Sequence, residues 1–441
     1  MSAKDVTIGI DIGTTAVKAV AADEDGHVVA RTRIPHQLLV SAPDRLEHDA
    51  DEAWRRGPLA AMGELGRPDA VAVAVTAMVP SLTAVDDDGR PLTPGLLYGD
   101  SRGRGPAGVD TTLLSRETVE FLRWTAREVP DAKGYWPATA VANHALAGEA
   151  VLDNATASTT YPLFDGTGWS EDLCAECGAT AGRMPRVEQT GAAVGQVRDA
   201  DAVLAAGSVD ALCEQLVAGA CRDGDVAVLC GTTLIVWVTI PEYREVPGLW
   251  TVPHITAGKF QIGGPSNAGG LFLGWVNTLV AEDNSTVDPG RVPVWSPYVR
   301  GERTPYFDPD RRAVLDGLDL TNGGASVRRA GYEASGFVVR QLIEMSGASA
   351  ARIVATGGGT RVHPWMQAIA DATGLPVDVS AVPEGAALGA AFIGRVAAGL
   401  ETSVADAARW ATTERVIDPD PAWTNPIQDR YARFLELAGR P

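Results

Sequence analysis

The chain has 441 residues, 45% of them hydrophobic and 21% charged, which is the composition of a globular protein and enough chain for two domains. Its 56 acidic residues outnumber its 37 basic residues, for a formal net charge of −19, and this balance argues against a nucleic-acid partner, which requires a basic face. A phosphorylated small molecule is still allowed, because backbone N–H groups and helix N-termini bind phosphate without net positive charge.

The first predicted elements form a β-hairpin with a glycine in its turn. Strands are expected over residues 6–10 and 17–22, and the sequence Asp11-Ile12-Gly13-Thr14-Thr15 follows the first of them. The Asp-Gly pair at residues 25–26 predicts a further turn, because this pair readily adopts left-handed backbone. A third strand is then expected over residues 27–31.

The turn of this hairpin has the residue types of a phosphate loop. Gly13 exposes neighbouring backbone N–H groups, and Thr14 and Thr15 add hydroxyl donors suited to phosphate oxygens. Asp11 could hold the Mg²⁺ of a nucleotide, usually through water. Taken alone, the pattern is equally consistent with a plain hairpin.

A similar hairpin is predicted in the second half of the chain. Strands are expected over residues 226–229 and 234–238, on either side of the turn that contains Gly231, Thr232 and Thr233. Its repetition of the first hairpin indicates a duplicated architecture, in which two loops could hold a polyphosphate between two domains. Because Pro241 follows the second hairpin, we expect domains that span residues 1–239 and 240–441.

The rest of the chain alternates β-branched runs with Ala-rich segments of helical period, which predicts an α/β protein. Helices are expected over residues 327–345, 363–373 and 383–398. A strand-like run precedes the three consecutive glycines Gly357, Gly358 and Gly359, and a predicted helix follows them. Glycines let the backbone approach a flat ligand or a phosphate closely, so this segment is a candidate nucleotide site.

Targeting and metal-site signals are weak. Residues 1–5 lead directly into a strand-like segment, and no run reaches the roughly 18 apolar residues of a membrane span, so we expect a cytoplasmic protein that does not bind membranes. Cys174 and Cys177 form a CxxC pair without a second pair, which favours reduced thiols over a zinc site. His48 and His363 lack partners at metal-ligand spacing, so no structural metal is predicted.

In their order and spacing, these motifs resemble the FGGY carbohydrate kinases over nearly the whole chain. Residues 9–18, which include Lys18, are similar to the first phosphate motif of the family, residues 229–233 to its second, and residues 356–359 to its adenosine loop. Further resemblance lies in residues 301–305, 313–333 and 383–391. It implies two actin-like (ribonuclease H-like) domains with a nucleotide and sugar cleft between them, ATP and Mg²⁺ as cofactors, and a small-molecule sugar or polyol as substrate. A homodimer is common among similar kinases.

The resemblance places the catalytic base at Asp210. Asp210 ends the segment 206–210 and precedes an Ala-rich stretch and the second phosphate loop, as in the family. A carboxylate here would accept the proton of the attacking hydroxyl during phosphoryl transfer. The alternative is that Asp210 only caps a helix over residues 211–221, and one aspartate can do both.

Candidate substrate contacts come from two segments that match the family only in part. Met78 would border the sugar in Ala77-Met78-Val79-Pro80, where xylulokinase-like members carry Gln-Met-His-Gly. Asp100 and Arg102 could hydrogen-bond hydroxyls or a carboxylate of the substrate. The alternative is a surface salt bridge.

The predicted function is therefore transfer of a phosphoryl group from ATP to a hydroxyl of a small sugar, sugar acid or polyol. Two rivals stay open. An actin-like switch ATPase would explain the phosphate loops but not the position of Asp210. A catalytically impaired sugar-binding regulator would fit the altered stretch around Met78 but not the intact Asp11 and glycine loops.

Overall fold

A computed structural model describes residues 5–42, 44–104, 115–254, 258–382 and 384–439. The chain divides into two compact units, which are described one at a time. Unit 1 contains Met1–Val217 and Glu384–Trp410, and unit 2 contains Ala218–Pro383 and Ala411–Pro441. Both units are therefore built from two separate stretches of chain. The predicted assignment of sugar binding to residues 1–239 and of adenosine binding to residues 240–441 stays a prediction.

Unit 1 is organised around a six-stranded sheet with the order β12-β13-β6-β1-β2-β3. The central strand β1 runs antiparallel to β2 and parallel to β6. In chain order its strands are β1 (Val6–Ile12), β2 (Ala16–Ala22), β3 (Val28–Pro35), β6 (Ala70–Ala77), β12 (Ala193–Gln196) and β13 (Val203–Val209).

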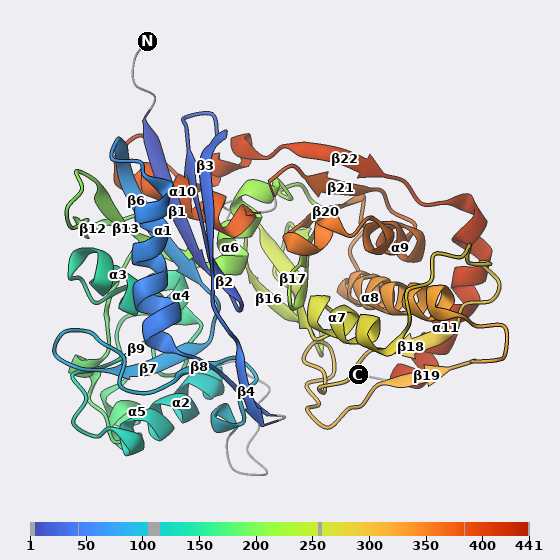
Figure 1. The fold of residues 1–441 in the computed structure, drawn as a ribbon, viewed down its shortest axis with the longest axis horizontal. Coiled ribbons are helices and arrows are strands. Elements are labelled where there is room, and N and C mark those ends of the chain that lie inside the picture. Colours follow the sequence, from blue (N-terminus) through green and yellow to red (C-terminus); the bar gives the residue numbers. More distant parts are fainter. Residues whose placement is uncertain (1–4, 43, 105–114, 255–257, 383, 440–441) are drawn as a thin grey trace. The chain divides into compact units, whose positions relative to one another are not determined.

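The two faces of β1 carry different residues, because side chains alternate along a strand. Ile8 and Ile10 are fully buried in a core with residues of α1 (Gly57–Leu65) and α3 (Ala138–Ala147). On the opposite face, a Cβ atom at Gly9 would collide with the backbone of α10 (Gly385–Ala397). Glycine therefore lets α10, from the far end of the sequence, pack directly on the blue strands in Figure 1.

The remaining elements of unit 1 form a second, five-stranded sheet with the order β4-β5-β8-β7-β9, a two-stranded sheet and short helices. The strands are β4 (Leu39–Ala42), β5 (Arg45–His48), β7 (Ser81–Val85), β8 (Gly95–Leu97), β9 (Gly134–Trp136), β10 (Val151–Asp153) and β11 (Arg186–Glu188). The helices are α2 (Ser115–Glu128), α4 (Asn154–Ser158), α5 (Glu171–Glu176) and α6 (Asp210–Ala218), and a π-helical turn spans Asp51–Arg56.

Unit 2 contains a seven-stranded sheet with the order β16-β17-β15-β14-β20-β21-β22. Its strands are β14 (Asp225–Cys230), β15 (Leu234–Ile240), β16 (Trp250–Pro253), β17 (Phe260–Ser266), β20 (Arg352–Thr356), β21 (Val377–Ser380) and β22 (Thr413–Ile417). A small sheet pairs β18 (Val294–Ser296) with β19 (Val314–Asp316). The helices are α7 (Gly270–Leu279), α8 (Gly324–Ser346), α9 (His363–Thr373) and α11 (Thr424–Ala438).

Buried ion pairs join the helices of unit 2. Glu333 of α8 is bonded to Arg329 one turn earlier and to Arg430 of α11. Arg329 also donates to Asp371 of α9 at 2.7 Å. Because each of these charges has a partner, the network fixes the packing of three helices instead of leaving buried charges unpaired.

The predicted elements that carry the motifs are confirmed. Each hairpin has the two expected strands, the third strand is present as β3, and α9 has the predicted bounds. The predicted helix over 211–221 is shorter and begins one residue earlier, since α6 spans Asp210–Ala218. The predicted helix over 383–398 corresponds to α10, and residue 383 lies outside the described residues.

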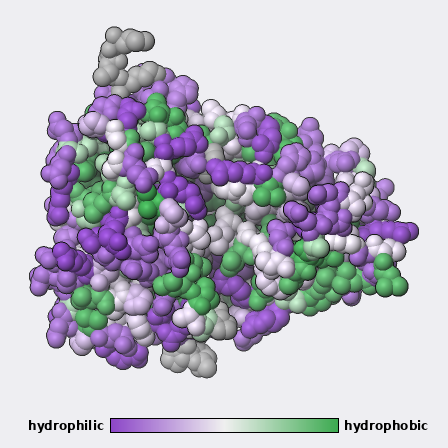
Figure 2. Space-filling model, viewed as in Figure 1, coloured by the Kyte–Doolittle hydropathy of each residue, from purple (hydrophilic) through white to green (hydrophobic). Residues whose placement is uncertain are grey.

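Hydrophilic residues cover most of the face in view in Figure 2, with smaller groups of apolar residues between them. Within the part of the chain that the structure describes, no helix combines the length and the apolar character needed to cross a bilayer.

Candidate active site

The first glycine hairpin carries an ion pair next to its turn. Asp11 of β1 and Lys18 of β2 face each other across the hairpin, and the Lys18 Nζ atom lies 3.1 Å from Asp11 Oδ2. The negative charge of Asp11 raises the pKa of Lys18. A Cβ atom added to Gly13 would lie 3.9 Å from both charged groups, so the backbone of the turn borders the ion pair. The structure thus brings Asp11, Gly13 and Lys18 together, and the metal and phosphate contacts predicted for them stay predictions.

The geometry of β13 directs Asp210 to its position. The pairing of β13 with β6 is irregular between Ala205 and Ser208, and a Cβ atom at Gly207 would collide with the backbone of Val75. Such irregularities re-aim the residues that follow them. Asp210 is the first residue of α6, and its Oδ1 atom accepts a hydrogen bond from the backbone N–H of Ala211 at 2.7 Å.

The surroundings of Asp210 favour a carboxyl that can take up a proton near neutral pH. Burial, followed by the negative charge of Asp11, raises the pKa of Asp210 to about 7, while the Ala211 N–H and Lys18 act in the opposite direction. The side chain nevertheless keeps part of its surface accessible. A carboxyl that is both reachable and poised near pH 7 has the properties of a general base.

The second glycine hairpin meets the N-terminal end of α7. The backbone N–H of Gly270 donates to the Gly231 carbonyl at 2.8 Å, and that of Leu271 donates to the Thr232 carbonyl at 3.1 Å. A Cβ atom at Gly269 would lie 2.5 Å from the Thr233 carbonyl carbon. The helix can approach the loop because its first residues are glycines. The Gly-Gly pair at residues 269–270 is the signal in the sequence for this contact.

Two neighbouring charged residues support the same loop. Arg303 donates from Nη2 to the Thr233 hydroxyl at 3.2 Å. Glu302 is buried and accepts hydrogen bonds from the Ser266 hydroxyl and from the Asn267 and Arg303 backbone N–H groups. Glu302 therefore fixes the link between β17 and α7. Both residues lie in a segment noted for its resemblance, although no role was assigned to them.

The three consecutive glycines follow β20 and have distinct environments. Gly357 has a φ of 89°, a conformation that favours glycine. A Cβ atom at Gly359 would lie 2.6 Å from the carbonyl oxygen of Cys230, the residue that precedes the second glycine turn. Gly358 has open space where a Cβ atom would lie. Unit 2 thus places the triple glycine beside Gly231, and both segments expose backbone.

Asp100 and Arg102 form a buried ion pair with each other. Asp100 is fully buried, and its carboxylate accepts hydrogen bonds from the Arg102 guanidinium and from the Leu46 N–H. Arg102 also pairs with Glu47 at 2.6 Å and lies over the ring of Trp124. This geometry favours a supporting role for both residues over direct substrate contact.

Met78 is also buried, as part of the main core of unit 1. Its predicted contact with the sugar stays a prediction, and so do the substrate contacts predicted for Asp100 and Arg102.

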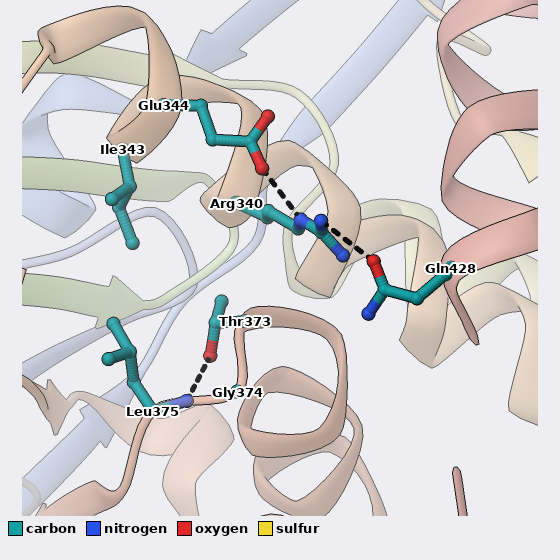
Figure 3. Close-up of a pocket in the computed structure, with 7 residues that line it drawn as sticks. All are labelled: Arg340, Ile343, Glu344, Thr373, Gly374, Leu375 and Gln428. Carbon is teal, nitrogen blue, oxygen red and sulfur yellow. Dashed lines mark hydrogen bonds and ion pairs between the residues drawn. The ribbon is translucent and has the colours of Figure 1, made fainter. Parts of the chain in front are cut away.

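A surface pocket in unit 2, shown in Figure 3, does not contain the predicted chemistry. It has a volume of about 180 Å³ and is lined by residues from the C-terminal parts of α8 and α9 and from α11. Arg340 is bonded there to Glu344 at 2.8 Å and to Gln428 at 2.9 Å. None of the predicted site residues lines this pocket.

The chain folds into two α/β units, and comparisons with known proteins specify its family. Residues 6–230 match the N-terminal domain model of the FGGY family of carbohydrate kinases, and residues 226–398 match its C-terminal domain model. The chain therefore belongs to the FGGY family of carbohydrate kinases and is a carbohydrate kinase with the two-domain actin-like fold.

Individual relatives cover nearly the same length. The chain is 26% identical to a xylulose kinase of Escherichia coli, covering 98% of each chain. It is 25% identical to a gluconokinase of Bacillus subtilis, covering 89% of this chain and 87% of the relative. Among solved structures, a protein described as a xyloylose kinase from Brucella ovis superposes with a TM-score of 0.82 at 24% identity and covers 98% of each chain.

Proposed function

We propose that the protein transfers the γ-phosphoryl group of ATP to a hydroxyl of a small sugar, sugar acid or polyol, with Asp210 as the general base. The observation that carries this proposal is the placement of Asp210 in the same unit as the Asp11–Lys18 pair, with a pKa raised to about 7 by burial and by Asp11. Similar proteins are named xylulose kinase and gluconate kinase, and both xylulose and gluconate belong to the proposed substrate class.

In this mechanism Asp210 accepts the proton of the substrate hydroxyl as that oxygen attacks the phosphorus atom. Lys18, whose pKa is raised by Asp11, stays cationic and offsets negative charge beside the first loop. Gly13, Thr14 and Thr15 offer backbone and hydroxyl donors to phosphate oxygens.

Unit 2 supplies the proposed nucleotide contacts. Gly231, Thr232 and Thr233 would bind phosphate, with Arg303 beside them as a cation. Gly357, Gly358 and Gly359 would lie against the adenosine, since Gly358 leaves open space where another residue would place a side chain.

Mg²⁺ fits the acidic first hairpin. Asp11 is a carboxylate next to a turn rich in hydroxyl and backbone groups, which is the oxygen-donor chemistry that Mg²⁺ requires. Asp11 would hold the ion, directly or through water, and the ion would neutralise charge on the phosphates.

The test is an ADP-release assay with D-xylulose, D-gluconate, other pentuloses and hexuloses, tetritols and glycerol as acceptors. We expect one acceptor class to stimulate ADP release, and Asp210→Asn to lower kcat by about 100- to 10,000-fold without unfolding the protein. Asp172→Asn, an exposed carboxylate of the same unit, is the matched control and should retain activity.

Two results would contradict the proposal. Near wild-type turnover in folded Asp210→Asn would exclude its role as the base. ATP hydrolysis that no acceptor stimulates would favour a switch ATPase, and acceptor binding without a phosphorylated product would favour a regulator.

A further inference from the structure

We infer that His48 is a positioning residue for phosphoryl transfer: it holds the Thr14 carbonyl so that the next peptide N–H faces the phosphate side of the first loop. This inference rests on the proposed function, in which Gly13, Thr14 and Thr15 bind phosphate. His48 is the last residue of β5, is fully buried, and places Nε2 at 2.8 Å from the Thr14 carbonyl oxygen. A carbonyl only accepts hydrogen bonds, so the Nε2 atom carries the proton.

Trp54 fixes the same tautomer from the other side of the ring. Its indole Nε1–H donates to His48 Nδ1 at 3.0 Å, and an indole nitrogen can only donate. His48 must therefore be neutral, with Nδ1 as an acceptor and Nε2–H as a donor. Burial and the neighbouring His36 lower the pKa of His48 to about 4, which keeps the ring neutral over the physiological range.

The adjacent residue Thr15 is held by His36, which follows β3. The backbone N–H of His36 donates to the Thr15 carbonyl at 3.1 Å, and the His36 ring packs edge-on against His48 with centroids 4.5 Å apart. Tyr98 contributes a third tether, because its hydroxyl lies 3.2 Å from the Thr14 hydroxyl. Two consecutive carbonyls and one side chain of the loop are thus anchored.

The consequence for phosphate follows from peptide geometry. In a planar trans peptide the C=O and the following N–H point in opposite directions. Because the Thr14 carbonyl points to His48, the Thr15 N–H points away from it, and Thr15 is an exposed residue. His48 therefore orients a donor for a phosphate oxygen without contacting the phosphate itself.

The experiment compares His48→Leu, which cannot donate, with His48→Gln, whose amide can. We expect His48→Leu to raise both the KM and the calorimetric Kd for ATP by about tenfold, to leave the KM of the acceptor within about twofold, and His48→Gln to restore most of the loss. The matched control is His254→Leu, which removes a buried histidine bonded to the Ala220 carbonyl in unit 2 and should leave the affinity for ATP unchanged.

Unchanged ATP affinity in folded His48→Leu, or equal loss in the Leu and Gln variants, would overturn the inference. If His48→Leu does not fold, the tautomer of His48 can be tested in the wild-type protein by a ¹⁵N spectrum with labelled histidine. A His48 ring protonated on Nδ1 would contradict the inference, and a ring protonated on Nε2 would support it. If wild-type protein binds ATP without acceptor-dependent turnover while His48→Leu loses ATP affinity, the inference stands and the proposed function fails. If the wild-type protein shows acceptor-dependent turnover but His48→Leu keeps its affinity for ATP, the proposed function stands and the inference about His48 fails.

Discussion

The two glycine hairpins share a Gly-Thr-Thr turn but differ in what lies next to it. In the first hairpin the second cross-strand pair from the turn is Asp11 and Lys18, and in the second hairpin the corresponding pair, Leu229 and Ile235, is apolar. The turns also differ in length, because Gly13 N–H bonds to the carbonyl three residues ahead and Gly231 N–H to the carbonyl two residues ahead. The two hairpins thus share the residues of their turn, whereas the charged cross-strand pair is found in the first hairpin and an apolar pair takes its place in the second.

The supports of the two loops differ as well. Side chains from distant segments hold the first loop, through His48 and Tyr98 on Thr14. Backbone groups at the start of α7 hold the second loop, with Arg303 as an additional contact. This difference predicts that the first loop is sensitive to loss of side-chain chemistry and the second to any added bulk.

Among the changes that test this comparison of the two hairpins, the largest effect is expected at the charged pair of the first hairpin. Asp11→Asn should lower kcat by about 100-fold and raise the Mg²⁺ concentration needed for half-maximal activity, because the neutral amide is a weaker partner for the ion. Steady-state kinetics over a Mg²⁺ series measure both quantities. Asp172→Asn serves as the control for the loss of one negative charge, and an unaltered Mg²⁺ requirement in Asp11→Asn would remove Asp11 from the metal site.

A smaller effect is expected at the second hairpin. Gly269→Ala should raise the KM for ATP by about tenfold with a smaller change in kcat, because the new Cβ atom would lie 2.5 Å from the Thr233 carbonyl carbon and the Leu234 nitrogen. Gly63→Ala, in a helix of unit 1 with open space around the Cβ position, is the control. Equal KM values in the two variants would mean that contact with α7 does not set the shape of the second loop.

The smallest effect is the pH dependence of the first hairpin. A general base must be ionised, and the pKa of Asp210 is raised to about 7, so kcat/KM should fall by about fourfold from about pH 8 to about pH 6.5. Because the charge of Asp11 raises this pKa, the residual activity of Asp11→Asn should show its decline at lower pH. Full pH profiles of kcat/KM for the wild-type protein and Asp11→Asn measure the shift of this decline along the pH axis. Superimposable profiles would show that the charge of Asp11 does not affect the pKa of Asp210.

The sequence was informative where a structure depends on neighbours in the chain. Alternating β-branched residues and the turn at Gly13 were enough to predict the first hairpin, and the same pattern around Gly231 predicted the second. The helix after the triple glycine was predicted to the residue, since periodic apolar positions coincide there with a glycine at its C-terminal end.

Contacts between segments that are distant in the chain could not be predicted from such local sequence patterns. The sequence around His48 has no metal-ligand spacing and indicates no role for this residue, because its partner Thr14 lies 34 positions earlier in the chain. Arg303 and Thr233 are 70 positions apart. For Asp100 and Arg102 the residue types allowed either a substrate contact or a surface salt bridge, and the structure shows an ion pair that is buried and that Glu47 joins.

Residues 384–410 belong to unit 1 although they follow most of unit 2 in the sequence, and this order affects folding during synthesis on the ribosome. Helix α10 covers the face of β1 on which Gly9 lies, so the six-stranded sheet, whose last strand ends at Val209, stays uncovered on that face until residues 385–397 have been made. Contacts between residues so far apart in sequence form late and slowly. Unit 2, although it begins later in the sequence, also awaits its last helix, α11. A fragment that ends at residue 239 would lack α10, and we expect the uncovered face of its sheet to make it prone to aggregation.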